Sequence, residues 1–368
     1  MRVFDKIKNS FKALIILYLF SITANSQEME ESMWAFQLDF TTEGQYNFSN
    51  PKANWVSLLY LHFELNPWKN GSFVLETNSI YNFLNEELIS DGIPVFSNID
   101  NESVPLSLYL SGYTHSFGNV SLFGGLRNVD GDFFSFEYSS VFINSPCGLF
   151  PPVGENFPVA TYPTSAMCIH GEVAITDHII FKNSLYNGVS RMLFNDKNRS
   201  IFSVNPKSDG IFNITGIGYA DDEKSAFYNI GFAVKTSYTE YSDEDKPEEI
   251  PSGYAFWANA EQRIFNARHK EIAIVAHASY TPSNHLFCSH YFGGGTVLQG
   301  FLSHKNQNRI GLFASYIKLD DVSEKILEVT CNYSIRDIFS IQPVFQYILI
   351  NHTNNFVGVL RLNYSFGL

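Results

Sequence analysis

Charged and amide side chains recur at alternate positions of many segments, and these residue types could recognise a solute. The set comprises Glu64, Glu76, Arg127, Asn229, Lys235, Glu261, Arg263, His277, Glu328, Gln342, Gln346 and Arg361. Arginine donates hydrogen bonds in a fixed fork, carboxylates accept them, and amides do both. A lining of both charge signs suits a neutral, hydroxyl-rich solute, whereas a strongly ion-selective pore carries rings of one sign. Such charges can also simply satisfy one another, because buried charges are normally paired.

Motifs for catalysis or metal binding are missing from the sequence. His269 and His277 have no accompanying Gly-x-Ser-x-Gly elbow, and neither an HExxH motif nor a phosphate loop occurs. The cysteines lack CxxC spacing, and they are Cys147, Cys168, Cys288 and Cys331. Cys147 and Cys168 bracket a proline-rich segment and could be bridged or remain free thiols. We therefore expect no catalytic residue, no metal ion, no cofactor and no enzymatic activity.

The candidate residues lie on the polar face of segments that alternate with period two. In residues 356–366, apolar and aromatic side chains occupy the even positions from Phe356 to Phe366, and Arg361, Asn363 and Ser365 occupy odd positions. Such alternation indicates a strand whose two faces meet different surroundings. Roughly sixteen such runs divide residues 27–368, which gives about 21 residues for each strand and its connection. Several runs reach ten residues, longer than the roughly 5–6 typical of soluble strands.

This pattern predicts an all-β fold, a closed antiparallel transmembrane β-barrel of about 16 strands. The composition agrees, because aromatic residues make up 16% of the chain and charged residues only 17%. A disordered chain would be poor in aromatic residues and rich in charge. With 24 Lys and Arg against 37 Asp and Glu, the net charge of −13 argues against a nucleic-acid partner.

The amino terminus has the pattern of an export signal. Four basic residues up to Lys12 precede the apolar stretch 13–22, and small residues follow at Ala24 and Ser26. The apolar stretch is shorter than the roughly 20 residues of a membrane-spanning helix. We expect residues 1–26 to be a cleaved signal peptide and residues 27–368 to form the barrel in the cell outer membrane of a Gram-negative bacterium.

Two segments interrupt the alternation. Residues 144–170 contain five prolines, which exclude a central strand, and several aromatic residues, which argue against disorder. We expect this segment to fold into or over the lumen and to form the constriction. Residues 242–249 are acidic and contain a proline, so they predict a solvated external loop, with a surface site for a divalent cation as the alternative.

Two regions resemble the carbohydrate-selective porin family. The first is Gly124-Gly125-Leu126-Arg127-Asn128-Val129-Asp130 with Phe133-Phe134, leading to Tyr162-Pro163. The second comprises Tyr291-Phe292-Gly293-Gly294, Glu328-Val329-Thr330-Cys331-Asn332-Tyr333, Ile341-Gln342-Pro343-Val344-Phe345-Gln346-Tyr347-Ile348, Leu360-Arg361 and Phe366. The resemblance implies a sixteen-stranded outer-membrane barrel that admits sugars, often as a trimer. It also implies Arg127, Asp130 and Glu64 at the constriction, with Glu328 and Arg361 on the wall.

These observations together predict a porin for passive, substrate-preferring diffusion of carbohydrates and other small polar solutes. The expected substrate-binding or pore-lining residues are Glu64, Arg127, Asp130, Glu261, Arg263, Glu328, Gln342, Gln346 and Arg361. Expected partners are carbohydrate solutes, outer-membrane lipid and two further copies in a homotrimer. The alternatives are a barrel with a lipid-hydrolase site and a plugged barrel that acts as a surface receptor or adhesin.

Overall fold

The computed structural model describes residues 33–89, 96–193, 200–240, 248–282, 286–302, 308–336 and 338–368. The expected signal peptide, residues 1–26, and most of the acidic segment, residues 242–247, lie outside the described residues. No helix in the described part of the chain is long and apolar enough to cross a membrane.

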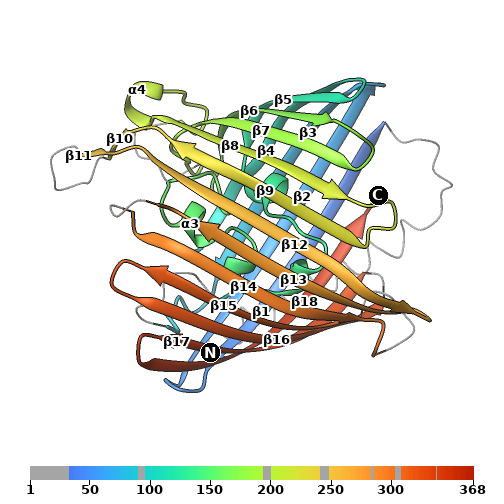
Figure 1. The fold of residues 1–368 in the computed structure, drawn as a ribbon, viewed down its shortest axis with the longest axis vertical. Coiled ribbons are helices and arrows are strands. Elements are labelled where there is room, and N and C mark those ends of the chain that lie inside the picture. Colours follow the sequence, from blue (N-terminus) through green and yellow to red (C-terminus); the bar gives the residue numbers. More distant parts are fainter. Residues whose placement is uncertain are drawn as a thin grey trace.

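Sixteen strands form one closed antiparallel barrel in which β1 pairs with β18 (Figure 1). Its strands are β1 Trp34–Asn47, β2 Lys52–Trp68, β3 Gly71–Asn82, β4 Val104–Phe117, β5 Val120–Arg127, β6 Ala166–Ala174, β7 Ile179–Asn187, β8 Ile211–Ala220, β9 Ala226–Lys235, β12 Gly253–Ala267, β13 Lys270–Tyr280, β14 Cys288–Gln299, β15 Arg309–Leu319, β16 Ser323–Arg336, β17 Phe339–Ile350 and β18 Thr353–Gly367. Closure removes both sheet edges, so every strand has two neighbours for its backbone hydrogen bonds. The predicted fold class is confirmed.

The period-two pattern separates the two faces of the wall. On β17 and β18, Phe345 and Phe356 are 62% and 53% exposed, whereas the adjacent Gln346 and Val357 are 2% and 1% exposed. Successive side chains of a strand point to opposite faces, so the exposed aromatic side chains form the outer surface of the barrel. The polar parity, including Gln346, faces the interior.

The interior contains a packed segment, residues 128–165, between β5 and β6. It forms four short helices, α2 Asp130–Phe133, η1 Ser139–Val141, η2 Ser145–Cys147 and α3 Pro151–Gly154. Figure 1 shows these helices inside the ring of strands. Phe134 and Phe150 of the segment pack with Trp257 and Tyr291 of the wall in one buried apolar cluster.

The boundaries of this segment differ from the expected 144–170. It begins at residue 128, because β5 ends at Arg127 and the short helices at residues 130–133 and 139–141 follow, which period-two reasoning does not detect. It ends at residue 165, because Ala166 pairs with Arg127 and opens β6 three residues after Pro163, the last proline of the segment. Residues 166–170 are therefore barrel wall.

Smaller elements occupy the connections at the end of the barrel where the segment enters. Helix α4 spans Pro206–Asp209, and strands β10 Tyr238–Glu240 and β11 Glu248–Ile250 form a separate two-stranded sheet. The four cysteines are all free, so the bridge considered for Cys147 and Cys168 is not formed.

Candidate functional site

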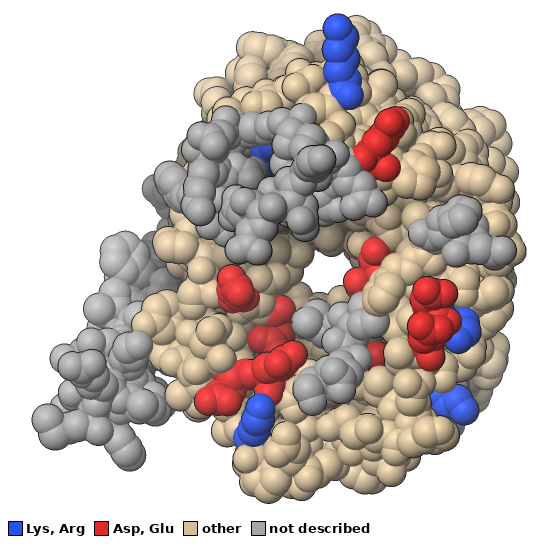
Figure 2. All heavy atoms as spheres, turned by 90° about the vertical axis from the view of Figure 1, so that its left-hand side faces the viewer, with Lys and Arg blue, Asp and Glu red and all other residues tan. Residues whose placement is uncertain are grey.

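One end of the barrel has an opening surrounded by acidic side chains. Figure 2 shows this end, which carries β10 and β11, with the opening near its middle and more Asp and Glu than Lys and Arg around it. A depression at the same end is lined by acidic residues, namely Glu86, Glu87, Asp100, Glu102 and Glu324. Burial raises the pKa of Asp100 to about 7, and the nearby Glu43 carboxylate adds to the increase. This mouth therefore loses negative charge as pH falls through neutrality.

Glu261 of β12 fixes the middle of segment 128–165. Its carboxylate accepts hydrogen bonds from the backbone N–H groups of Tyr138 and Ser139, both at 2.8 Å, and from the Ser139 hydroxyl. The start of η1 leaves these N–H groups without partners inside the helix, and a carboxylate satisfies them. Glu261 is fully buried, and its carboxylate holds the segment against the wall.

Glu328 of β16 binds the segment in the same way, a few residues further along the segment. Its two oxygens accept the N–H groups of Ile143 and Asn144 at 2.9 and 3.0 Å. Gln346 on the adjacent strand donates to Glu328 at 3.1 Å and to the Phe96 carbonyl at 2.7 Å. Glu328 and Gln346 thus join the wall to two interior segments.

Gln342 and Arg361 complete this side of the barrel. Gln342 donates to the Val141 carbonyl at 2.7 Å. Arg361 donates to Glu43 and to the Asn98 side chain, each at 2.5 Å. Asn98 belongs to the connection between β3 and β4, so this arginine holds a second stretch of chain inside the barrel. Both wall residues are more than nine-tenths buried.

Arg127 lies at the end of β5, where segment 128–165 begins. Its guanidinium forms a two-pronged ion pair with Asp132 of α2 and lies 4.6 Å from the ring centre of Phe123. Two residues earlier, Gly125 has φ +153°, and a Cβ there would meet the Ser111 carbonyl at 2.3 Å. Only glycine fits this close approach of β4 and β5, which explains part of the Gly-Gly motif before Arg127.

Asp130 closes the segment on itself. It accepts the Tyr162 N–H at 2.9 Å and the Thr161 hydroxyl at 2.8 Å, which joins the start of the segment to its end. Burial raises the pKa of Asp130 above its ordinary value, although these donors act in the opposite direction. Asp130 is thus engaged within the segment, and Arg127 pairs with Asp132, two residues further along.

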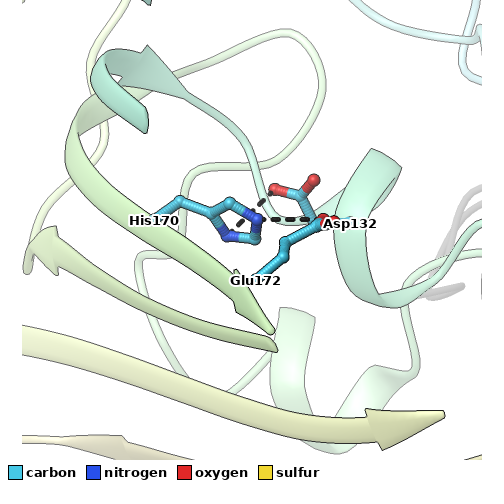
Figure 3. A group of neighbouring side chains, drawn as sticks. All are labelled: Asp132, His170 and Glu172. Carbon is cyan, nitrogen blue, oxygen red and sulfur yellow. Dashed lines mark hydrogen bonds and ion pairs between the residues drawn. The ribbon is translucent and has the colours of Figure 1, made fainter. Parts of the chain in front are cut away.

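A charged network surrounds Arg127. Figure 3 shows Asp132, His170 and Glu172, with His170 Nε2 3.1 Å from Glu172 and Nδ1 3.8 Å from Asp132. Lys182 on β7 lies 3.2 Å from Glu172. The atoms of these three residues that could bind a metal ion, one from each, lie within 4.8 Å of one another. Arg127 and Lys182 already neutralise both carboxylates, so a divalent cation would have to displace these two groups.

The remaining expected residues lie elsewhere on the inner wall. Glu64 of β2 accepts a hydrogen bond from the Ser72 hydroxyl at 2.6 Å and is 3.8 Å from His62. Arg263 lies two residues beyond Glu261 on β12 and pairs with Glu223 and Glu271, each at 3.3 Å. These residues are separate from the Arg127 network.

Sequence analysis did not single out Asp132, His170, Glu172 and Lys182. His170 and Glu172 share one parity, and the wall register pairs Glu172 directly with Lys182. That i, i+2 pattern was therefore available in the sequence once β6 was known to start at Ala166. Asp132 stands in a four-residue helix, where no strand period applies.

The comparisons with known proteins agree with this architecture. The family model described as carbohydrate-selective porin, OprB family, matches residues 61–366. No curated protein sequence matches the chain. The high-pH structure of Pseudomonas putida OprB has a TM-score of 0.76 at 16% identity, covering 90% of this chain and 94% of that one.

More distant barrels also superpose. A variant of the Rh. blastica porin gives a TM-score of 0.57 at 9% identity, covering 91% of this chain and all of that chain. Pseudomonas aeruginosa OpdK with vanillate gives 0.52 at 8% identity, covering 91% of this chain and 99% of that one. At such low sequence identity, these structural similarities show the fold alone.

Proposed function

Because the chain belongs to the carbohydrate-selective porin, OprB family, we propose that it is an outer-membrane porin for passive diffusion of sugars and other small polar solutes. One observation carries this proposal most directly. The interior is only partly filled, since an opening remains beside the packed segment at the acidic end (Figure 2). A narrowed, polar passage passes small solutes by size and hydrogen bonding.

The lumen residues fall into a more buried and a less buried group, and we propose a different role for each. We infer that Glu261, Glu328, Gln342, Gln346 and Arg361 hold the interior segments in place. Arg127 and Glu64 are less buried, and they would meet the solute together with the Asp132 network. Segment 128–165 would then be the constriction.

Export, assembly and membrane contact complete the proposal. Residues 1–26 would direct the chain out of the cytoplasm and be removed, and the exposed aromatic parity would contact outer-membrane lipid. Assembly as a homotrimer is proposed from the family resemblance.

One geometric feature favours the alternative that the barrel carries a lipid-hydrolase site. The Ser139 hydroxyl lies 3.2 Å from His277 Nε2. Both side chains are at least 97% buried, and the same hydroxyl donates to Glu261. No substrate reaches this pair, so channel function is the better supported account.

Sugar uptake by vesicles tests the proposal. The mature chain, residues 27–368, is reconstituted into liposomes, and osmotic swelling is followed in D-glucose. We expect swelling much faster than in vesicles with heat-denatured protein. Equal rates would refute the porin proposal, and a single Ser139→Ala change that abolished phospholipid turnover would favour the hydrolase.

A further inference from the structure

The outer wall of the barrel carries an apolar groove of about 460 Å³ over β16, β17 and β18. These strands lie side by side, next to the closure of the barrel between β18 and β1 (Figure 1). The outward-facing residues of its lining are Phe48, Leu327, Val329, Phe345, Tyr347 and Phe356. Its volume lies within the roughly 300–1,000 Å³ of small-molecule sites. We call it the β18 groove.

A glycine of β18 gives the groove its depth. Gly358 follows Phe356 by two residues, so it faces outward, and it pairs with Phe345 of β17. A Cβ at Gly358 would meet Phe48 Cε2 at 2.9 Å. The Phe48 N–H donates to the Phe356 carbonyl at 2.8 Å and so fixes this residue at the edge of the groove. A side chain at position 358 would therefore push against Phe48 and narrow the groove.

The wall becomes polar at the end of the groove that points toward the acidic mouth. The Tyr347 hydroxyl donates to the Asn354 side-chain oxygen at 2.6 Å, and both groups lie at the surface. Lys325 precedes Leu327 by two residues on β16, which places it about 7 Å closer to the mouth. Tyrosine is enriched where the membrane hydrocarbon meets the head groups. Lys325 thus lies at the level expected for lipid head groups.

Two lysines face outward at this level. Glu324 and Ile326 are 1% and 3% exposed and face the interior, so Lys325 between them faces outward. Lys318 of β15 pairs with Ser323, two residues before Lys325. The two lysines are therefore diagonal neighbours on one face, about 7–8 Å apart at their backbones. Their long side chains can reach a single anion together.

The two ammonium groups keep donors available for such an anion. Lys318 Nζ donates to the Asp320 carbonyl at 3.0 Å, and each ammonium has three donors. Asp320 and Asp321 follow in the adjoining turn, yet no carboxylate of the described residues lies within 4.0 Å of either Nζ. The whole chain has a net charge of −13, so an outward pair of lysines beside an apolar groove departs from the general charge of the molecule.

We propose that the β18 groove and the two lysines bind one membrane lipid with an anionic phosphate head group. The phosphate lies between Lys318 and Lys325, and one acyl chain runs along Gly358 in the groove. Basic clusters beside a membrane-facing surface bind anionic head groups in this way. This inference rests on the proposed position of the barrel in the membrane, and it does not depend on the passage of sugars.

Three variants test the two halves of the site. Lys325→Gln removes one charge at the head group and keeps a side chain of similar length, whereas Lys325→Arg keeps the charge. Gly358→Val narrows the groove, and the exposed Phe48 ring can turn away without disturbing the backbone. A phosphate site requires the charge at position 325, and an acyl-chain site requires the space at position 358.

Each substitution has a matched control on the same outer face. Lys270→Gln removes an exposed lysine that lies over the Phe301 ring at the other end of the barrel. Gly294→Val adds the same side chain to an outward-facing glycine of β14, where a Cβ meets nothing closer than 3.5 Å. Both controls lie outside the groove and its two lysines.

Native mass spectrometry of the mature chain in detergent measures the binding. Phosphatidylglycerol, which is anionic, and phosphatidylcholine, whose phosphate is balanced by its own cation, are titrated separately. Wild type should bind phosphatidylglycerol more tightly. Lys325→Gln should weaken phosphatidylglycerol binding about fivefold, the worth of one lysine at an anionic surface, and leave phosphatidylcholine binding unchanged. Gly358→Val should weaken the binding of both lipids, and the controls and Lys325→Arg should match wild type.

The outcomes separate this inference from the proposed function. Equal affinity of wild type for the two lipids, or unchanged phosphatidylglycerol binding in either Lys325→Gln or Gly358→Val, overturns the lipid site. Sugar entry into vesicles, measured with the same preparations, would then still support the porin. Failure of the chain to insert into vesicles would instead contradict the membrane position itself. Weaker phosphatidylglycerol binding in both test variants, with both controls unchanged, supports the site.

Discussion

The lumen side chains differ in how much of their hydrogen-bonding capacity remains for a solute. The carboxylates of Glu261 and Glu328 each accept hydrogen bonds from two backbone N–H groups and one side chain. Arg127 instead shares its guanidinium with one aspartate in a partly exposed network. At the residue scale, we therefore expect selectivity to depend on this network more than on the buried anchors.

Removing the Arg127 charge should change ion preference. Arg127→Ala leaves Asp132 without its ion-pair partner, so the passage should favour cations more strongly. One unit charge a few ångströms from a passing ion is worth about 1 kcal/mol in water-like surroundings, or about fivefold in permeability ratio. Reversal potentials in a salt gradient measure this ratio.

Arg263→Ala is the control for that experiment. Its side chain pairs with Glu223 and Glu271, away from the Arg127 network. No change of ion preference in Arg127→Ala would remove Arg127 from the passage, and a shift in Arg263→Ala alone would place the selective charge elsewhere on the inner wall.

Asp100 should make stability depend on pH. Its pKa of about 7 in the folded protein exceeds the ordinary 3.8, so the folded state favours the protonated form. This contribution to stability is full below about pH 4 and is lost as pH rises through 7. Asp100→Asn should therefore unfold like wild type near pH 4 and be more stable above pH 7.

The size of that effect follows from the pKa shift. A difference of 7 − 3.8, about 3 units, sets an upper limit of about 4 kcal/mol at about 1.4 kcal/mol per unit. Thermal unfolding in detergent at pH 4, 6 and 8 measures it. Identical pH profiles for the two proteins would contradict the raised pKa.

At the scale of elements, segment 128–165 is held to the wall by contacts distant in sequence. Glu261 and Ser139 are 122 residues apart, and Glu328 and Ile143 are 185 apart. Two carboxylates with two N–H groups each fix the positions of η1 and η2. The position of the proposed constriction therefore depends on β12 and β16 as much as on the segment's own sequence.

Glu328→Ala should loosen the constriction. It leaves the N–H groups of Ile143 and Asn144 without acceptors, and hydrogen bonds to charged groups are worth about 1.5–3 kcal/mol each. We expect a larger and noisier single-channel conductance with a barrel of unchanged strand content. Glu223→Ala is the control, since the Glu223 side chain is 80% exposed in the connection between β8 and β9 and pairs with Arg263. A quiet, wild-type conductance in Glu328→Ala would argue against this anchoring.

Sequence reasoning identified the strands more completely than the interior. The alternation around Arg361 and Gln346 correctly placed these residues on the inner face, because a strand has a fixed period. The same pattern carries no information on which inner residues meet the inserted segment. Those contacts join residues more than a hundred positions apart, and the short helices around Asp132 have no strand period. Asp132 and the earlier start of the segment were missed for that reason.

At the scale of the whole molecule, the barrel presents a continuous exposed apolar surface. Leu327, Val329 and Phe345 on neighbouring strands are between 43% and 62% exposed. Such a surface is stable against lipid or detergent and would aggregate in plain buffer. The mature chain should therefore need detergent to stay dispersed.

A charge in the middle of that surface should destabilise the barrel in lipid. Val329 lies near the centre of β16, and Val329→Lys should cost about 2–4 kcal/mol, as for basic residues at the bilayer midplane. Val329→Leu is the matched control and should fold like wild type. Urea unfolding in lipid vesicles compares the three proteins, and an unchanged midpoint for Val329→Lys would contradict lipid contact at this position.

The entry rate of neutral sugars of increasing size into vesicles tests the central claim most directly. A water-filled barrel narrowed by segment 128–165 predicts fast entry of a monosaccharide, slower entry of a disaccharide and little entry of a large oligosaccharide. Glu328→Ala should raise the rates of the larger sugars most. Entry of none of these sugars above the protein-free rate would contradict the account.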